Sequence, residues 1–272
     1  MRRARALLVS AAVLAVLVPA TAAEAAPGVT AFERTAGTAW WHDPADGRLT
    51  VSLDDTVSSA TLVRAVRRSG GVVIREPGVL RRHIAGADPF FGASSGRCLI
   101  GFNARSLPDY YFLTSAHCVG AVGSAVYGDS AHTVVLGAVA TKNVTYDYAL
   151  VHYTNTAIAK PSAVHLPNGT LSPITGFGPG TVGQAVTRTG TSGIHTGRIT
   201  ALNATVNYAD GTVVGLIRTS VCSEPGDSGG PLFAGTVGLG LTSGGSGNCT
   251  SGGTTYFASA ARAATGYGVA PY

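Results

Sequence analysis

The 272-residue sequence has few charged side chains, and they do not gather into a basic surface. Charged residues make up 12% of the chain, and the formal net charge is +5. From Ile84 onward, eight lysines and arginines stand against seven aspartates and glutamates, which leaves a net charge of only +1. The basic excess lies in residues 1–83. Because nucleic-acid binding needs a clustered basic face, we expect no nucleic-acid partner.

Long apolar runs are also lacking. The longest, Ala6 to Val18, is shorter than the roughly 20 residues that a membrane-spanning helix needs. A basic head, Met1 to Arg5, precedes it, and a small-x-small pattern, Ala23-Glu24-Ala25, follows it. These features predict a signal peptide over residues 1–25 and a secreted, extracellular protein without a membrane partner. An N-terminal membrane anchor is the alternative.

Cysteine is scarce, and none of the four cysteines forms a C-x₂-C pair. Zinc sites built on cysteine usually contain such close pairs, so we expect no metal site. Behind a signal peptide an even number of cysteines indicates disulfides, and four cysteines allow three pairings. We favour the neighbouring pairs, Cys98–Cys118 and Cys222–Cys249. Each would close a loop of roughly 20–30 residues, which stabilises a protein by about 3–4 kcal/mol.

Helical periodicity is nearly absent after Ile84. Glycine and threonine separate short runs rich in β-branched and aromatic residues, such as residues 110–114, 148–153 and 236–241. This spacing is typical of all-β barrels or sandwiches. One closing helix is predicted near residues 257–265.

Residues 26–83 differ from the rest of the chain. They contain both tryptophans, eight of the seventeen arginines and no cysteine. An alternating run over 49–53 predicts a strand, and residues 60–68 predict a helix. We therefore expect a small α+β prosegment over residues 26–83. The alternative is an N-terminal subdomain that the mature protein keeps.

No histidine, aspartate or glutamate follows Ser228. This absence matters because the stretch CSEPGDSGG, residues 222–230, contains the pattern G-x-S-x-G. In α/β-hydrolases that pattern holds a nucleophilic serine, and an acid and then a histidine follow it in the chain. The order cannot be completed here, which also argues against an esterase of that type. A base and an acid for Ser228 must lie upstream.

His117 and Asp147 are the upstream candidates. A serine hydroxyl needs a base to take its proton and a third group to orient that base. His117 ends the strand-like run YYFLTSAH, and Cys118 follows it directly. Asp147 opens the apolar run DYALV, where a buried carboxylate is costly unless it accepts hydrogen bonds. The alternatives are a structural histidine and a strand-capping aspartate.

These motifs carry a family resemblance. TSAHC (114–118), DYALV (147–151) and CSEPGDSGGPL (222–232) resemble the chymotrypsin-fold serine proteases. The streptogrisin group of secreted bacterial proteases, related to α-lytic protease, is the closer match. ITALNATVNY (199–208) and LTSGGSGNCTSGGTT (241–255) extend the resemblance over nearly all of residues 84–272. It implies two six-stranded antiparallel β-barrels, residues 84–170 and 171–272, with a short C-terminal helix.

The resemblance implies a serine endopeptidase that cuts protein and peptide substrates through an acyl-enzyme. His117 would be the general base, Asp147 would orient it, and Ser228 would attack the carbonyl. The oxyanion hole would be the backbone N–H groups of Gly226 and Ser228. A binding protein on an inactive scaffold is the rival hypothesis, but such proteins usually lack a member of the triad and this chain lacks none.

Other implied features concern maturation. Asp227 would pair with Arg188 instead of a newly freed amino terminus. The prosegment would therefore act as a folding aid and inhibitor. The family implies a monomer without a cofactor. The mature chain would begin at Ile84. Cleavage after Leu80 with later trimming, or cleavage by another protease, is the alternative.

The predicted substrate pocket is open and uncharged. Ser220 stands where trypsin-like relatives have an aspartate, and Thr242 stands where glutamate-specific relatives have a histidine. The wall Ser243-Gly244-Gly245 has no large side chain, and its backbone would pair with substrate. A large apolar residue, Phe, Tyr or Leu, is therefore expected before the scissile bond.

Overall fold

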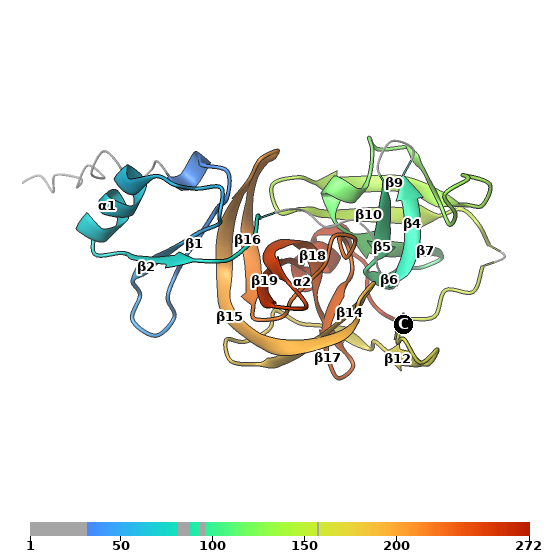
Figure 1. The fold of residues 1–272 in the computed structure, drawn as a ribbon. Helices are drawn as coiled ribbons and strands as arrows, with labels where there is room; N and C mark the ends of the chain where they lie inside the picture. Colours follow the sequence, from blue (N-terminus) through green and yellow to red (C-terminus); the bar gives the residue numbers. More distant parts are fainter. Residues whose placement is uncertain (1–31, 81–86, 93–95, 157) are drawn as a thin grey trace, which may run out of the picture.

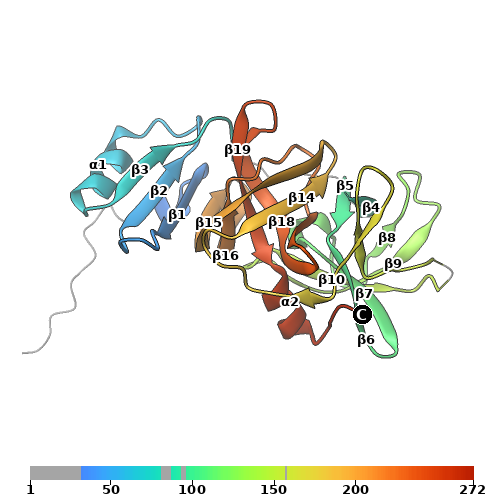
Figure 2. The same cartoon turned by 90° about the horizontal axis from the view of Figure 1, so that it is seen from below.

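The computed structural model describes residues 32–80, 87–92, 96–156 and 158–272. Figure 1 shows these residues as a row of lobes. A small lobe that contains α1 (Ala60–Arg68) lies at one end, followed by a central β lobe that contains β15 (Gly193–Tyr208). A second β lobe, which contains β10 (Tyr148–Tyr153), lies at the other end. The view in Figure 2 gives the same order.

The small lobe is a helix packed on a short sheet. Ser59 caps α1 by accepting a hydrogen bond from the Leu62 backbone, and Leu62 and Val66 are buried against the strands. Helix α1 covers the range predicted from the sequence. The other elements of this lobe are η1 (Phe32–Arg34), β1 (Thr38–His42), β2 (Leu49–Leu53) and β3 (Val72–Arg75).

This lobe extends the sheet of the central lobe. Strand β1 pairs antiparallel with β15, with Ala39 opposite Val206. The Asn207 side chain donates a hydrogen bond of 2.8 Å to Thr38 Oγ1. Residues of the predicted prosegment thus cover the end of β15.

The strands from β4 to β10, within residues 88–153, form the first barrel. Its sheet runs in the order β5-β4-β8-β9-β10-β7-β6, and β5 and β6 are separated in the chain by Gly101 alone. Since β5 and β6 are two halves of one interrupted strand, the pairings close on themselves. The strand bounds are β4 (Asp88–Gly92), β5 (Arg97–Ile100), β6 (Phe102–Ser106), β7 (Asp109–Thr114), β8 (Ala125–Tyr127) and β9 (Val135–Asn143).

The central lobe closes in the same way. Its order β14-β17-β18-β19-β16-β15 returns to the start because β14 also pairs with β15, while β13 adds a short parallel pairing to β18. The bounds are β13 (Gly176–Phe177), β14 (Ala185–Gly190), β16 (Gly211–Thr219), β17 (Pro231–Ala234), β18 (Val237–Asn248), β19 (Gly252–Ser259) and α2 (Ala260–Tyr267).

The segment between the barrels is not a plain linker. Strand β11 (Ala163–His165) pairs with β12 (Leu171–Pro173), so this hairpin spans the boundary expected at residue 170. Val164 is buried in the core between the barrels. Within the described ranges, no helix is long and apolar enough to cross a membrane.

A shared apolar core fixes the two barrels against each other. Phe102 and Leu113 of the first barrel belong to the same buried cluster as Leu216, Leu241 and Tyr256 of the second. Because close-packed interiors resist small displacements, groups from the two barrels can meet in a fixed geometry at this junction.

Two disulfides anchor the loops at the junction. Cys98–Cys118 ties β5 to η2 (Ala116–Cys118), and Cys222–Cys249 ties the loop before Ser228 to the end of β18. These are the neighbouring pairs favoured from the sequence.

Candidate active site

His117 and Asp147 lie in direct contact. Strand β7 leads into η2, which contains His117, and the Cys98–Cys118 disulfide anchors the adjacent residue. His117 Nδ1 is 2.9 Å from Asp147 Oδ2, and the His117 backbone N–H donates to Asp147 Oδ1 at 3.1 Å. The His117 side chain is 7% exposed and the Asp147 side chain is fully buried. One carboxylate thus fixes both the ring and the backbone of the histidine.

Asp147 also contacts the second barrel. Ser243, on β18, donates a hydrogen bond of 2.6 Å to Asp147 Oδ2. Asp147 itself has a backbone φ of 54°, a region that aspartate tolerates better than most residues. Several donors offset the cost of burying the carboxylate. The sequence assigned Ser243 to the pocket wall, and the structure gives its hydroxyl this further contact.

Ser228 lies in a loop held between the barrels. Its carbonyl accepts a hydrogen bond of 3.0 Å from the Leu99 N–H of the first barrel. Next to it, Gly229 N–H donates to Thr242 O of the second barrel at 2.8 Å. In the described part of the chain, the buried Ser228 Oγ has no hydrogen-bond partner. No hydrogen bond to the surrounding described groups therefore holds this hydroxyl.

The turn before Ser228 leaves backbone donors available. Gly226 has a φ of 108°, which residues with a side chain rarely adopt. Asp227 N–H donates to Glu224 O and Gly230 N–H donates to Asp227 O, both at 3.0 Å. Among the described groups, the N–H of neither Gly226 nor Ser228 has an acceptor. Such paired N–H groups suit a negatively charged oxygen.

A buried ion pair supports this turn from within. Arg188 Nη1 lies 2.5 Å from Asp227 Oδ2, and both side chains are fully buried. Thr191 N–H donates to Asp227 Oδ1 at 2.9 Å, and Glu224 N–H donates to Oδ2 at 2.8 Å. Burial lowers the pKa of the Arg188 guanidinium, and the Asp227 carboxylate opposes that shift. The structure brings these two predicted partners together.

The predicted pocket residues fall into two groups. Thr242, Ser243, Gly244 and Gly245 lie together on β18 and are buried. Ser220 differs, because it is exposed and its hydroxyl accepts a hydrogen bond of 3.1 Å from the Arg198 N–H of β15. We therefore remove Ser220 from the predicted pocket: the end of β16 directs its side chain to a neighbouring strand.

Other histidines have surface partners. His152 lies 3.2 Å from Asp109, His165 lies 2.8 Å from Asp88, and His132 stacks on Tyr127. His195 lies near Cys222 and Cys249, but that potential metal-binding group has no free thiolate because the two cysteines form a disulfide.

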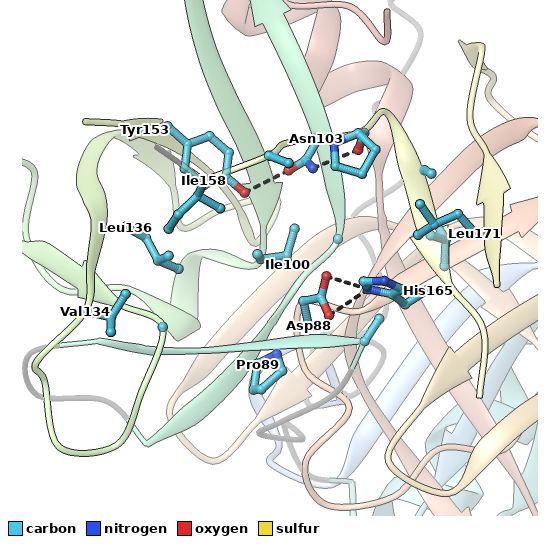
Figure 3. Close-up of a pocket in the computed structure, with 17 residues that line it drawn as sticks. Asp88, Pro89, Ile100, Asn103, Val134, Leu136, Tyr153, Ile158, His165 and Leu171 are labelled. Atoms are coloured by element: carbon cyan, nitrogen blue, oxygen red, sulfur yellow. Dashed lines mark hydrogen bonds and ion pairs between the residues drawn. The ribbon is translucent and has the colours of Figure 1, made fainter. Parts of the chain in front are cut away.

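A separate cavity of about 370 Å³ lies beside the first barrel (Figure 3). Ile100, Leu136 and Ile158 give it an apolar lining, and the Asp88–His165 ion pair lies at its edge. Neither His117, Asp147 nor Ser228 lines this cavity. This apolar cavity is therefore separate from the candidate active site.

The segment that follows β3 reaches the second barrel near the candidate site. Gly78, with a φ of +87°, lies so close to β18 that an added Cβ would be 2.9 Å from the Gly247 nitrogen. Leu80 is buried, and its N–H donates to Asp54 Oδ2 at 2.7 Å. No sequence motif predicted this contact, which depends on residues about 170 positions apart.

Comparison with known families identifies the scaffold. The trypsin family profile matches residues 98–265, which include His117, Asp147 and Ser228. The chain belongs to the trypsin family. It is a serine protease of the streptogrisin type, as its relatives show.

Curated relatives come from Streptomyces. Serine protease 2 of Streptomyces fradiae is 52% identical over 176 residues, which are 63% of this chain and all of that protein. Streptogrisin-D of Streptomyces griseus is 46% identical over 240 residues, which are 85% of this chain. The chain spans 60% of the length of Streptogrisin-D. Glutamyl endopeptidase 2 of Streptomyces griseus is 38% identical over 192 residues, which are 70% of this chain and all of that protein.

Solved structures agree with the chymotrypsin-like fold. The α-lytic protease homolog N4 matches with a TM-score of 0.63 and 41% identity, over 70% of this chain and all of that one. Cellulomonas bogoriensis chymotrypsin matches with a TM-score of 0.61 and 39% identity, over 70% of this chain and 98% of that one. The predicted fold class is confirmed.

Gly190 provides a test of the buried ion pair. A Cβ at this position would lie 2.1 Å from Arg188 Nη1 and 2.1 Å from Asp227 Oδ1. We expect Gly190→Ala to lower the free energy of unfolding by about 1–3 kcal/mol, as overpacking does in cores. Guanidinium denaturation measures this loss.

Gly176→Ala is the matched control, because a Cβ there meets nothing within 4 Å. Its midpoint is expected to stay near that of the unchanged chain. Equal midpoints for the two variants would contradict the tight packing around the ion pair.

Proposed function

We propose that the chain is a secreted serine endopeptidase in which His117, Asp147 and Ser228 form the catalytic triad. The observation that carries this proposal is the buried His117–Asp147 pair, at 2.9 Å, at the junction where the loop of Ser228 is held. Among the described groups the Ser228 hydroxyl has no hydrogen-bond partner, His117 included, so we propose that it turns to the His117 ring when a substrate binds.

The reaction follows the acyl-enzyme route. Ser228 Oγ attacks the carbonyl carbon of the scissile peptide bond while His117 Nε2 takes the hydroxyl proton. Asp147 accepts from Nδ1–H and stabilises the imidazolium that forms. The carbonyl oxygen becomes an oxyanion and accepts from the N–H groups of Gly226 and Ser228. His117 then protonates the leaving amine as the C–N bond breaks.

Water completes the cycle. His117 takes a proton from the water molecule as the water oxygen attacks the acyl carbon. The ester bond to Ser228 Oγ breaks, and the proton returns to the serine. The two halves of the reaction thus use the same base and the same oxyanion donors. No cofactor is required.

The specificity that best fits the pocket is for Phe, Tyr or Leu before the scissile bond. Thr242 to Gly245 contribute no charge, and the Thr242 hydroxyl donates to Gly230 O at 3.1 Å. An uncharged wall leaves the desolvation cost of a Glu or Arg side chain uncompensated. The relative named glutamyl endopeptidase makes glutamate the main competing preference.

Residues 26–83 are proposed as a prosegment behind a signal peptide over residues 1–25. The pairing of β1 with β15 gives this segment a template role in forming the second barrel. Near its end, Glu76 and Gly78 contact Ser246 and Gly247 of β18, the strand along which a substrate would pair. These contacts support the proposal that the prosegment is an inhibitor as well as a folding aid. The proposed mature enzyme is a monomer that begins at Ile84 and contains both barrels.

Ser228→Ala tests the nucleophile. We expect hydrolysis of peptide amides with Phe, Tyr or Leu before the cut, and a fall in kcat of at least about 10,000-fold in the variant. Release of the amine by mature protein measures the rate. Efficient cleavage after Glu or Arg would keep the triad but overturn the specificity, whereas retained activity in the variant would overturn the nucleophile.

Gly78→Ala tests the inhibitory contact of the prosegment. An added methyl group would overlap the Gly247 backbone. We expect the inhibition constant of residues 26–83, added to the mature enzyme, to rise by about 10-fold or more.

Gly70→Ala is the matched control, because Gly70 has a similar φ of +80° and a Cβ there meets nothing within 4 Å. If both variants inhibited as well as the unchanged segment, the contact at Gly247 would not contribute to inhibition.

A further inference from the structure

Arg218 is a partly buried cation on the second barrel. It lies on β16, and its side chain is 13% exposed. Its Nη1 donates to Thr200 Oγ1 at 2.9 Å, and its Nη2 approaches Thr254 Oγ1 at 3.5 Å. Groups of the protease barrel thus hold the guanidinium in one orientation.

The counter-ion of Arg218 comes from the prosegment. Glu76 Oε1 forms an ion pair with Arg218 Nη2, and Glu76 Oε2 accepts a hydrogen bond of 2.9 Å from Ser246 Oγ. The Trp41 ring covers the guanidinium, with Arg218 Cζ 4.3 Å from the ring centroid. In the described ranges, Glu76 is the one carboxylate in contact with Arg218.

Removal of residues 26–83 takes away Glu76 and Trp41 together. Thr200, Thr254 and Ser246 remain, because all three belong to the barrel. Tyr256 lies beside the guanidinium, and burial raises the pKa of its hydroxyl in the uncleaved chain. Without these two side chains the guanidinium is exposed to incoming substrate, still oriented by Thr200 and Thr254. A guanidinium held in one orientation binds a carboxylate at low entropic cost.

The Glu76 carboxylate also lies next to β18, the strand along which an extended substrate would pair. Ser246, which binds Glu76, and Gly247, which contacts Gly78, follow Ser243 to Gly245 on the same strand. A substrate paired along β18 would therefore bring a residue well before its scissile bond to Arg218.

We propose that Arg218, with Ser246, forms a carboxylate-binding subsite of the mature protease that favours Asp or Glu several residues before the scissile bond. The Glu76 side chain occupies this subsite in the uncleaved chain. The inference rests on the proposed endopeptidase function and adds a second determinant of specificity, remote from the pocket next to the cut.

Three peptides test the subsite. Each has an acetylated N-terminus and the sequence Xaa-Pro-Gly-Val-Leu-Arg-Arg-Phe-Ile-Ala, which is residues 76–85 with Phe in place of His83. Xaa is Glu, Gln or Lys. Cleavage after Leu and cleavage after Phe are followed separately by chromatography for the mature enzyme, for Arg218→Gln and for Arg198→Gln. The last is the matched control, because the exposed Arg198 side chain donates to Gly183 O, away from Glu76.

For the unchanged enzyme we expect kcat/KM to be about 10-fold higher with Glu than with Gln, and lower still with Lys. The preference for Glu over Gln should fall below about 2-fold in Arg218→Gln and persist in Arg198→Gln. Both variants should cleave a short Phe amide, which does not reach the subsite, at the unchanged rate.

Two failures are distinguishable. Equal cleavage of the three peptides by the unchanged enzyme, or a Glu preference that survives Arg218→Gln, would overturn the subsite. Absence of cleavage for the peptides and for the short Phe amide alike would instead overturn the endopeptidase function and remove the basis of the inference.

Discussion

The Asp147 carboxylate lies at the junction of the two barrels and takes hydrogen bonds from both of them. From the first barrel, the His117 backbone N–H donates to this carboxylate, and His117 Nδ1 lies in contact with it. From the second barrel, the Ser243 hydroxyl donates to it. A small rotation of one barrel against the other would break this set. The shared apolar core prevents such a rotation, because Phe102 and Leu113 pack in one cluster with Leu241 and Tyr256. Packing between the barrels thus sets the orientation of the candidate base.

The loop of Ser228 is fixed independently of that carboxylate. Arg188 and Asp227 form a buried pair that supports the turn, and this pair is complete while the prosegment is still joined to the chain. The site therefore does not depend on a new amino terminus for its shape. In the proposed function, control comes instead from occupancy: Glu76 and Gly78 contact Ser246 and Gly247 of β18, and Glu76 pairs with Arg218 of β16. Removal of the prosegment would expose a site whose residues are already in position.

The sequence predicts local features well and long-range contacts poorly. Strands at 49–53 and 148–153 and the helix at 60–68 match their predicted bounds, because alternation and helical periodicity are local signals. Local motifs and chain order pointed to His117, Asp147 and Ser228, and the resemblance supplied their roles. It did not supply the Ser243–Asp147 hydrogen bond, whose partners lie 96 residues apart. Ser220 was misplaced in the pocket because its side chain direction depends on how β16 pairs with β15. The Glu76–Arg218 pair has no sequence signature at all.

Covalent labelling of the mature protein with a fluorophosphonate tests whether His117 activates Ser228 as a nucleophile. The serine oxygen attacks phosphorus, fluoride leaves, and the base accepts the hydroxyl proton. We expect one adduct per chain, located by peptide mapping on Ser228, and a large loss of labelling in His117→Ala. Labelling of another serine, or equal labelling of Ser228 without the histidine, would contradict a catalytic site at the junction of the two barrels.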